Sequence, residues 1–322
     1  MLRGAWKRVR GFFARLFGRA PPAPGRFERG SKFALAGRLA AAPWIWPARE
    51  YLVYVPRGHG RWRRYPLVVM IHGCKQTPEE FAAATRIAAL ADEQGWLLLL
   101  PRQEKKANPW SCWNWFDIAT GEGRGEAAIV AAQVRAVRRH YRVHPRRVFL
   151  AGFSAGGGLA AALGVRHPQL FAGVFIHSGL PCASAAGPSA ATKVMKNGAK
   201  DDPARVGIAA RSMAGDVALP LVVLHGGRDD VVAPINATQL VRQFLALNGL
   251  DPASEPEVKR SDAGAGRVVE TSDYRAAGRI AVRLVSVPQL GHAWSGGDES
   301  HPYNDARPPD AARLIAEMVE GR

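Results

Sequence analysis

Residues 147–166 read RVFLAGFSAGGGLAAALGVR, and the expected fold follows from this segment. It begins with a short apolar run that predicts a buried strand, and residues 155–166 predict a helix. Ser154 lies between them in the pattern Gly-x-Ser-x-Gly, flanked by Gly152 and Gly156. Such a tight turn leaves no room for side chains beside the serine and exposes its hydroxyl above the sheet. The alternative interpretation is a glycine-rich turn ahead of a close-packed helix.

Short apolar runs and longer helical patterns alternate along most of the chain. We expect strands at residues 50–55, 67–71, 96–100, 147–151, 173–176, 219–224, 268–274 and 280–287. We expect helices at residues 78–94, with Thr77 as the N-cap, and at 125–140, 155–166, 236–247 and 310–319. This alternation predicts an α/β fold with a mostly parallel sheet and helices on both faces. One such domain over residues 31–322 fits better than two.

The net charge is the unusual feature of the composition. The 322 residues carry 44 Lys plus Arg against 27 Asp plus Glu, which gives +17 and a pI near 10.6. This balance favours an acidic partner such as nucleic acid or a membrane surface, or else reflects an Arg-rich solvated surface. No window approaches 18 uninterrupted apolar residues, which excludes a membrane-spanning helix. The hydrophobic content of 47% is that of an ordinary folded protein.

The first thirty residues hold a large share of this charge. They contain eight Lys or Arg against one acidic residue, Glu28. Apolar residues recur between the basic ones at helical spacing, so residues 1–30 predict a basic amphipathic helix followed by a Pro-rich linker. Arg15 and Arg19 interrupt every apolar run that a secretory signal would need. The expected partner is an anionic membrane or a granule surface, and the alternative is a packed helix or a disordered tail.

A reactive serine needs a base to take its proton, and the base needs an orienting acid. In this architecture the acid and then the base follow the serine along the chain, each on a loop after a strand. Asp229 follows one predicted strand, and His292 follows the last. We therefore expect Ser154, Asp229 and His292 to be the catalytic residues. Asp230 is the alternative acid, because spacing does not separate adjacent aspartates.

The loop after residues 67–71 is the expected oxyanion hole. The backbone N–H of Cys74 would act with that of Ala155, and Gly73 lets the backbone approach closely. Cys74 as a thiol nucleophile is the alternative, although no neighbouring base is evident in the sequence. Three cysteines are too few and too scattered for a zinc site or a disulfide scaffold: Cys74, Cys112 and Cys182.

Four separate motifs give the chain a family resemblance. These are His72-Gly73-Cys74-Lys75-Gln76, Cys112-Trp113-Asn114-Trp115-Phe116, Gly152-Phe153-Ser154-Ala155-Gly156-Gly157 and Gly291-His292-Ala293-Trp294-Ser295-Gly296-Gly297. Together they resemble the poly(3-hydroxybutyrate) depolymerase esterases, which are similar to carbohydrate esterases acting on acetylated xylan and feruloyl arabinoxylan. The resemblance covers about residues 48–300. It implies an α/β-hydrolase fold and a serine esterase in which Asp229, ahead of Asp230, is the acid.

The resemblance also bears on substrate and location. It implies a carboxylic-ester hydrolase acting on hydroxyalkanoate oligomers or polymer, with acetylxylan or feruloyl esters as the alternative. This chemistry requires no cofactor and no metal. Known members are largely secreted, which implies an extracellular location. A cytoplasmic, surface-associated location is the alternative, because the sequence begins with a basic amphipathic segment instead of a clear signal.

Tryptophans gather near the expected catalytic edge. Trp113, Asn114, Trp115 and Trp294 are candidate substrate-binding residues that would line an apolar acyl or sugar cleft. The alternative is that the rings wedge their loop against the body. The polar loop with His301, Asn304 and Asp305 is interpreted as plain surface.

Two further expectations concern the cysteines and the class of protein. In an oxidising compartment, a disulfide between Cys74 and Cys112 could join the oxyanion loop to the loop that carries Trp113 and Trp115, called here the Trp loop. A different class of protein would also carry this charge, namely a basic membrane- or polyanion-binding protein on a hydrolase-like body with little catalysis. The intact order of serine, acid and base argues against that second class. We expect no specific nucleic-acid partner.

Overall fold

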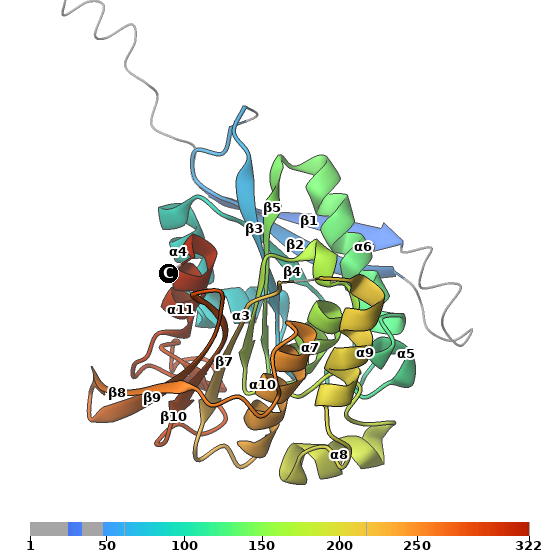
Figure 1. Ribbon diagram of the computed structural model, residues 1–322. Coiled ribbons are helices and arrows are strands. Elements are labelled where there is room, and N and C mark those ends of the chain that lie inside the picture. The colour runs from blue at the N-terminus through green and yellow to red at the C-terminus, as the bar shows by residue number, and fades with distance from the viewer. Residues whose placement is uncertain (1–24, 34–47, 61, 217, 322) are drawn as a thin grey trace, which may run out of the picture.

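A ten-stranded sheet forms the framework of the molecule in its computed structural model, which describes residues 25–33, 48–60, 62–216 and 218–321 (Figure 1). In chain order the strands are β1 (Arg26–Phe33), β2 (Ala48–Val55), β3 (Tyr65–Ile71), β4 (Leu97–Pro101), β5 (Val143–Phe153), β6 (Gly173–His177), β7 (Leu221–Gly226), β8 (Glu257–Gly264), β9 (Arg267–Ala276) and β10 (Arg279–Val287). They lie side by side in the order β1-β2-β4-β3-β5-β6-β7-β10-β9-β8.

The six central strands of this sheet are parallel. β4, β3, β5, β6, β7 and β10 pair in parallel, while β1 with β2 and β9 with β8 add antiparallel strands at the two sides. The carboxyl ends of the parallel strands therefore meet at one edge of the sheet. Binding sites of α/β proteins form at this edge.

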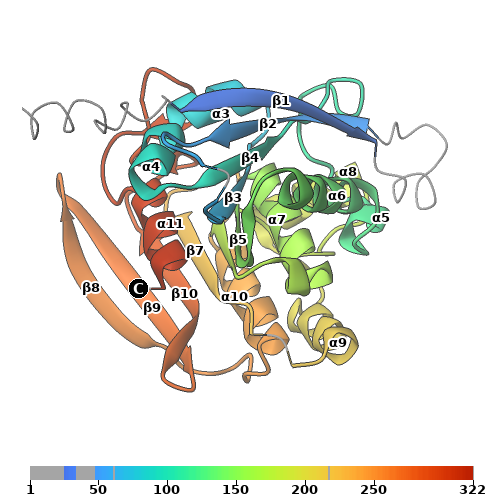
Figure 2. The same ribbon diagram turned by 90° about the horizontal axis from the view of Figure 1, so that it is seen from above.

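Helices cover both faces of the sheet (Figure 2). They are α3 (Pro78–Ala84), α4 (Ile87–Gln94), α5 (Ile118–Gly121), α6 (Gly125–His140), α7 (Ala155–Arg166), η1 (Pro168–Leu170), α8 (Pro188–Asn197), α9 (Ala204–Ala214), α10 (Ile235–Leu247) and α11 (Ala311–Glu320). One apolar core lies between the sheet and α6, α7 and α10, and the second lies under α3, α4 and α11. The prediction of a mostly parallel sheet with helices on both faces is confirmed.

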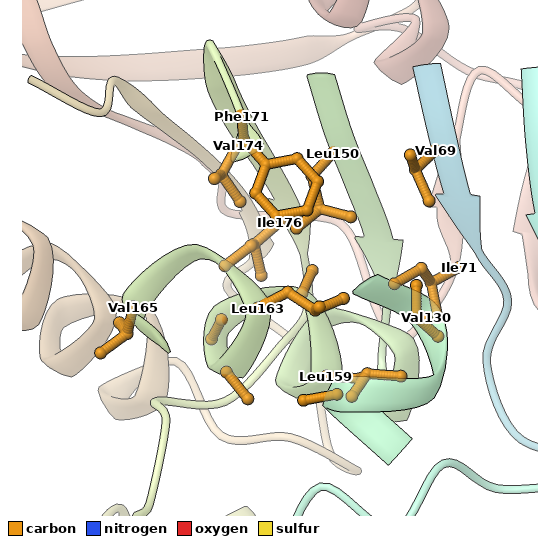
Figure 3. Packing of buried hydrophobic residues seen from close by; sticks show 14 of the residues in the cluster. Val69, Ile71, Val130, Leu150, Leu159, Leu163, Val165, Phe171, Val174 and Ile176 are labelled. Carbon is orange, nitrogen blue, oxygen red and sulfur yellow. The ribbon is translucent and has the colours of Figure 1, made fainter. Parts of the chain in front are cut away.

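Helix α7 begins directly after Ser154 and is buried along almost its whole length. Its side chains Leu159 and Leu163 pack with Leu150 of β5 and Ile176 of β6 (Figure 3). Each fully buried leucine contributes about 1.5–3 kcal/mol to the free energy of folding. This packing fixes the start of α7, and therefore the serine, against the sheet.

The helix predicted at residues 78–94 is in fact two helices. Thr77 caps α3 as expected, with its side chain and that of Glu80 forming a capping box. The chain then breaks at Arg86, whose φ of 53° is left-handed and does not occur inside a helix. The carbonyl of Ala84 accepts a hydrogen bond from the amide of Asp298 instead of from the next helical turn. A distant loop thus ends α3, which no local pattern predicts.

Several elements have weak sequence signals and were not expected: β1, β8, α5, α8, α9, and the short parallel pair β11 (Trp294–Ser295) with β12 (Asn304–Asp305). Strand β1 begins at Arg26, five residues before the expected start of the domain at residue 31. The amphipathic helix predicted before it lies outside the described residues. In the part of the chain that the structure describes, no helix is long and apolar enough to cross a membrane.

Candidate active site

The turn that holds Ser154 is as tight as its sequence predicts. Ser154 has φ 55° and ψ −120°, a strained conformation for a residue with a side chain. A Cβ on Gly152 would lie 2.3 Å from the carbonyl oxygen of Gly156, and one on Gly156 would lie 2.3 Å from that of Ile71. Both glycines are therefore required by space, and the strand–serine–helix turn is confirmed.

The structure brings Ser154, His292 and Asp229 together. His292 Nε2 lies 2.9 Å from the hydroxyl of Ser154, and His292 Nδ1 lies 2.8 Å from Oδ2 of Asp229. Since an ionised carboxylate only accepts, Nδ1 carries the hydrogen and Nε2 is left to accept the serine proton. The serine follows β5, the aspartate follows β7 and the histidine follows β10. Residues 138 positions apart thus meet at the carboxyl edge of the sheet.

The environment separates the two adjacent aspartates. The side chain of Asp229 is fully buried, and its Oδ1 accepts from the amides of Val231 at 3.0 Å and Val232 at 2.7 Å. Asp230 is exposed, and its carbonyl accepts from Lys196. Only Asp229 reaches His292, so geometry favours it as the acid, as the family resemblance implies.

Hydrogen bonds keep Asp229 ionised. Burial alone raises the pKa of this carboxyl, but the hydrogen bond and charge of His292 and the amide of Val232 outweigh burial and hold the pKa below its usual value. The loops of acid and base are also joined directly, because Arg228 N–H donates to the carbonyl of Leu290 at 2.9 Å. Asp229, the candidate orienting acid, is thus held as a fixed negative charge.

Two buried histidines for which the sequence predicted no role support this arrangement. His225 Nε2 donates to the carbonyl of Val232, next to Asp229. His177 Nε2 accepts from the amide of Ser295 at 3.1 Å, three residues after His292, and its ring stacks on Trp294. Burial lowers the pKa of both imidazoles and keeps them neutral. Their signal in the sequence is only their position at the ends of β6 and β7.

The expected oxyanion loop follows β3. The amides on either side of Cys74 are engaged, that of Gly73 by Oε1 of Gln76 at 2.8 Å and that of Lys75 by the carbonyl of Trp110 at 2.7 Å. Cys74 itself forms a disulfide with Cys112. The bridge between the oxyanion loop and the Trp loop is therefore present, and the alternative of Cys74 as a free thiol nucleophile is wrong.

The candidate substrate-binding residues are mostly inside the protein. Trp113 is 0% exposed and Trp294 is 1% exposed, so neither ring reaches a surface cleft. Trp115 is also buried, and its ring packs directly on Gly158 of α7, where a Cβ would lie only 2.8 Å from the ring. The prediction that these rings line the cleft is wrong, because they wedge loops against the body. The amide of Asn114 is engaged within its own loop and by Glu126.

The polar loop after His292 is also more than plain surface. Asp305 pairs with Arg267, whose side chain is 1% exposed, and with Arg307. The interpretation of Asp305 as plain surface is therefore wrong. Among the described residues, no group of three or more His, Cys, Asp or Glu is arranged to hold a metal ion.

Comparison with known proteins assigns the sequence to a family. The sequence profile described as esterase PHB depolymerase matches residues 49–268. The chain belongs to this esterase family. It is 30% identical over 231 residues to poly(3-hydroxyalkanoate) depolymerase C of Paucimonas lemoignei, covering 70% of this chain and 54% of that protein. It is 24% identical to the poly(3-hydroxybutyrate) depolymerase of Ralstonia pickettii, covering 95% of this chain and 65% of that one.

The chain is also similar to esterases named for other substrates, in sequence and in fold. The chain is 25% identical over 198 residues to feruloyl esterase B of Thermothelomyces thermophilus, covering 59% of this chain and 68% of that protein. An acetyl xylan esterase from Aspergillus awamori superposes with a TM-score of 0.69 at 18% identity, covering 83% of this chain and 94% of the other. The predicted α/β-hydrolase fold is confirmed. The chain spans between about half and two thirds of the length of the two depolymerases.

Proposed function

We propose that this chain is a serine carboxylic-ester hydrolase in which Ser154, His292 and Asp229 form the catalytic triad. The observation that carries the proposal is the unbroken hydrogen-bond chain from the hydroxyl of Ser154 through His292 to the buried Asp229. Membership of the esterase family supports the reaction class. The strained backbone at Ser154 supports its role as nucleophile, because strain of this kind is concentrated at functional sites.

In the first half of the reaction, Ser154 Oγ attacks the ester carbonyl while His292 Nε2 takes the hydroxyl proton. Asp229 stabilises the imidazolium that forms and keeps its own charge. When the tetrahedral intermediate collapses, the C–O bond to the alcohol breaks and His292 gives its proton to the leaving oxygen. The products of this half are a free alcohol and an acyl group on Ser154.

Water completes the second half by the same route. His292 takes a proton from the attacking water, and the second tetrahedral intermediate collapses to release the carboxylic acid and return the proton to Ser154. Both intermediates carry an oxyanion, for which we propose the backbone N–H groups of Cys74 and Ala155. Ala155 is the first residue of α7, and the first N–H groups of a helix have no intrahelical acceptor. Removing one such donor costs roughly 3–4 kcal/mol where it has been measured.

We further propose hydroxyalkanoate esters, as oligomers or polymer, as the substrate. The family match and the two depolymerases support this choice. A second candidate is an acylated saccharide, which the feruloyl esterase relative supports. A panel of hydroxybutyrate oligomers, polymer film, acetyl-xylan and feruloyl-sugar separates them, since the proposal expects the highest kcat/KM on the oligomers. A higher value on either sugar ester would overturn the substrate proposal.

Replacing the nucleophile tests the mechanism. Ser154→Ala should lower kcat on a short-chain nitrophenyl ester by at least about 10⁴-fold, because the acyl-enzyme no longer forms. Ser212→Ala, at an exposed serine of α9 whose hydroxyl contacts only the carbonyl of Ile208 among the hydrogen bonds described, is the control and should keep most of the activity. If Ser154→Ala kept its esterase activity, the mechanism would be wrong.

Because β1 already belongs to the sheet from Arg26, we also propose that residues 1–25 hold the extracellular enzyme at an anionic surface and that the catalytic domain begins with β1. The six Lys or Arg in residues 1–25 support the proposal. Deleting residues 1–20, which leaves β1 intact, should abolish binding to anionic vesicles while kcat on a soluble ester is unchanged. Vesicle binding that survives the deletion would contradict it.

A further inference from the structure

A buried polar network lies behind the loop that carries Cys74. Its members are Arg49 of β2, Gln103 after β4 and Glu126 of α6, which are 2%, 4% and 4% exposed. Arg49 and Glu126 approach to 3.9 Å. Removing two charges from water costs several kcal/mol per ion, so a buried ion pair is a poor source of stability by itself. Its place behind the candidate oxyanion hole therefore points to another role.

Glu126 accepts hydrogen bonds through both of its carboxyl oxygens, and burial raises the pKa of this carboxyl while these hydrogen bonds and the charge of Arg49 oppose the rise. Its Oε2 accepts from the amide of Asn114 at 2.7 Å, and its Oε1 accepts from Nδ2 of Asn114 at 3.0 Å and from Nε2 of Gln103. Both oxygens thus face N–H donors. A glutamine in this place would have the same shape, but its NH₂ group would replace one of the two oxygens and would face an N–H donor of Asn114 or Gln103.

Gln103 passes this constraint to the oxyanion loop. Its side-chain oxygen accepts from Nε of Arg49 at 3.2 Å, and its Nε2 donates to the carbonyl of Cys112 at 2.9 Å as well as to Glu126. Its backbone N–H donates to Nε2 of His72 at 3.2 Å. Since His72 Nε2 accepts, the ring hydrogen is on Nδ1.

His72 then fixes the peptide group of the proposed oxyanion donor. Its Nδ1 donates to the carbonyl of Gly73 at 2.8 Å. That carbonyl and the N–H of Cys74 are the two ends of one planar peptide group. A hydrogen bond to the oxygen therefore orients the N–H at the other end and polarises it toward its acceptor.

We propose that Glu126 and Gln103 are positioning residues, which act through His72 to hold the Gly73–Cys74 peptide group in the orientation that stabilises the oxyanion. This inference rests on the proposed esterase function. The network contacts the carbonyl end of the peptide group, and the N–H at the other end would face a negative charge that develops only in the transition state. We therefore expect the network to stabilise the transition state and to leave binding of the ground-state ester unchanged.

The test is Glu126→Gln, measured with a short-chain nitrophenyl ester and an alkyl boronic acid that forms a tetrahedral adduct on Ser154. We expect kcat to fall at least about tenfold, a part of the 10²–10³ that loss of a whole donor costs. KM should stay within about twofold, and affinity for the boronic acid should fall by the same factor as kcat. Gln103→Met, a second isosteric change, should give the same pattern if Glu126→Gln fails to fold.

Asp273→Asn is the matched control. Asp273 is also buried, 5% exposed, and pairs with Arg283 at 2.6 Å and 2.8 Å, but on β9 and β10 at the side of the sheet. It should lower the melting temperature with kcat unchanged. If Glu126→Gln and Gln103→Met, both folded, matched this control in kcat and boronic acid affinity, the inference would be overturned while the proposed function stood. An inactive wild type would overturn the proposed function itself.

Discussion

At the scale of single residues, Asp229 and Asp230 show how surroundings separate identical side chains. One carboxylate is fully buried and accepts from two backbone amides and from His292, whereas the next residue is exposed. A group fixed in this way does not need to reorganise when the imidazole beside it becomes charged. Position along the chain carries none of this information.

Replacing each aspartate in turn by asparagine measures how much each one contributes to kcat. Asp229→Asn should lower kcat by about 10⁴-fold, because the amide favours the wrong tautomer of His292. Asp230→Asn should change kcat by less than about twofold. Steady-state kinetics on a nitrophenyl ester provides both numbers, and a large loss in the second variant would transfer the acid role to Asp230.

The stability of the protein should also report the ionisation of Asp229. Its pKa is lower in the folded protein than the value near 3.9 of an unfolded chain. The ionised form therefore contributes stability that is fully present above about pH 4 and is lost as the pH falls through the lowered folded value. We expect the difference in unfolding free energy between wild type and Asp229→Asn to shrink from pH 6 to pH 3 in denaturant titrations. A difference that grows toward acid would contradict this.

The tryptophans mark the limit of prediction at this scale. A ring near a catalytic edge has the same sequence signature whether it faces a cleft or the core. Trp294 stacks on His177 and meets Phe81 edge-on, two partners from other elements. Its burial is decided by these contacts between elements, and the sequence around residue 294 does not contain them.

Among the helices and strands, the close approach of α7 to β3 sets the position of Ser154. A Cβ on Gly156 would lie 2.3 Å and 2.4 Å from the carbonyl oxygens of Ile71 and His72, and both of these atoms are backbone. No side chain is available to move aside. The start of the helix would therefore have to shift.

Gly156→Ala should consequently cost about 3 kcal/mol of folding free energy, the upper end of the range for overpacking, and should abolish most activity. Gly60→Ala is the matched control, because its Cβ would meet only the hydroxyl of Tyr65 at 3.9 Å. Chemical denaturation of the two variants checks the difference. Equal stabilities would show that the turn tolerates a side chain.

The disulfide joins two loops that are 38 positions apart in the sequence. Closing a loop of this length restricts the unfolded chain, and such bridges contribute about 2–4 kcal/mol. We expect reduction to lower the melting temperature. Under denaturing conditions, alkylation should label Cys182 alone without reductant and all three cysteines with it. Three labelled thiols without reductant would contradict the bridge.

The elements also divide by how local their causes are. Helices α6 and α7 begin and end where the sequence predicts, because their signals lie within them. The break between α3 and α4 depends on Asp298, more than two hundred residues away. The sequence of β1 could not be told from that of a linker, since its contacts are with residues distant in the chain, namely β2 and Tyr141.

Across the whole molecule, the order of strand ends explains why the meeting of Ser154, Asp229 and His292 could be predicted from the sequence. Serine, acid and base each follow a parallel strand, and parallel strands place their carboxyl ends together. Three positions in sequence thus become one position in space. The support behind them, from His72 to Glu126, comes from side chains that approach across elements and has no local signal.

The net charge of +17 belongs to the whole chain and does not define its chemistry. The candidate triad is buried, and its one charged member has a fixed partner. Salt should therefore weaken surface binding while leaving kcat on a neutral soluble ester within about twofold between 0.05 and 0.5 M, because screening acts mainly on exposed charges. Parallel vesicle-binding and kinetic measurements check this, and a tenfold fall in kcat would contradict it.

Covalent labelling shows whether Ser154 is the nucleophile of an esterase. The protein is mixed with a fluorophosphonate, digested, and examined by mass spectrometry while residual activity on a nitrophenyl ester is followed. We expect one adduct per chain, on Ser154, with activity lost in proportion to labelling. Full activity in the labelled protein, or an adduct on another residue with Ser154 unmodified, would contradict it.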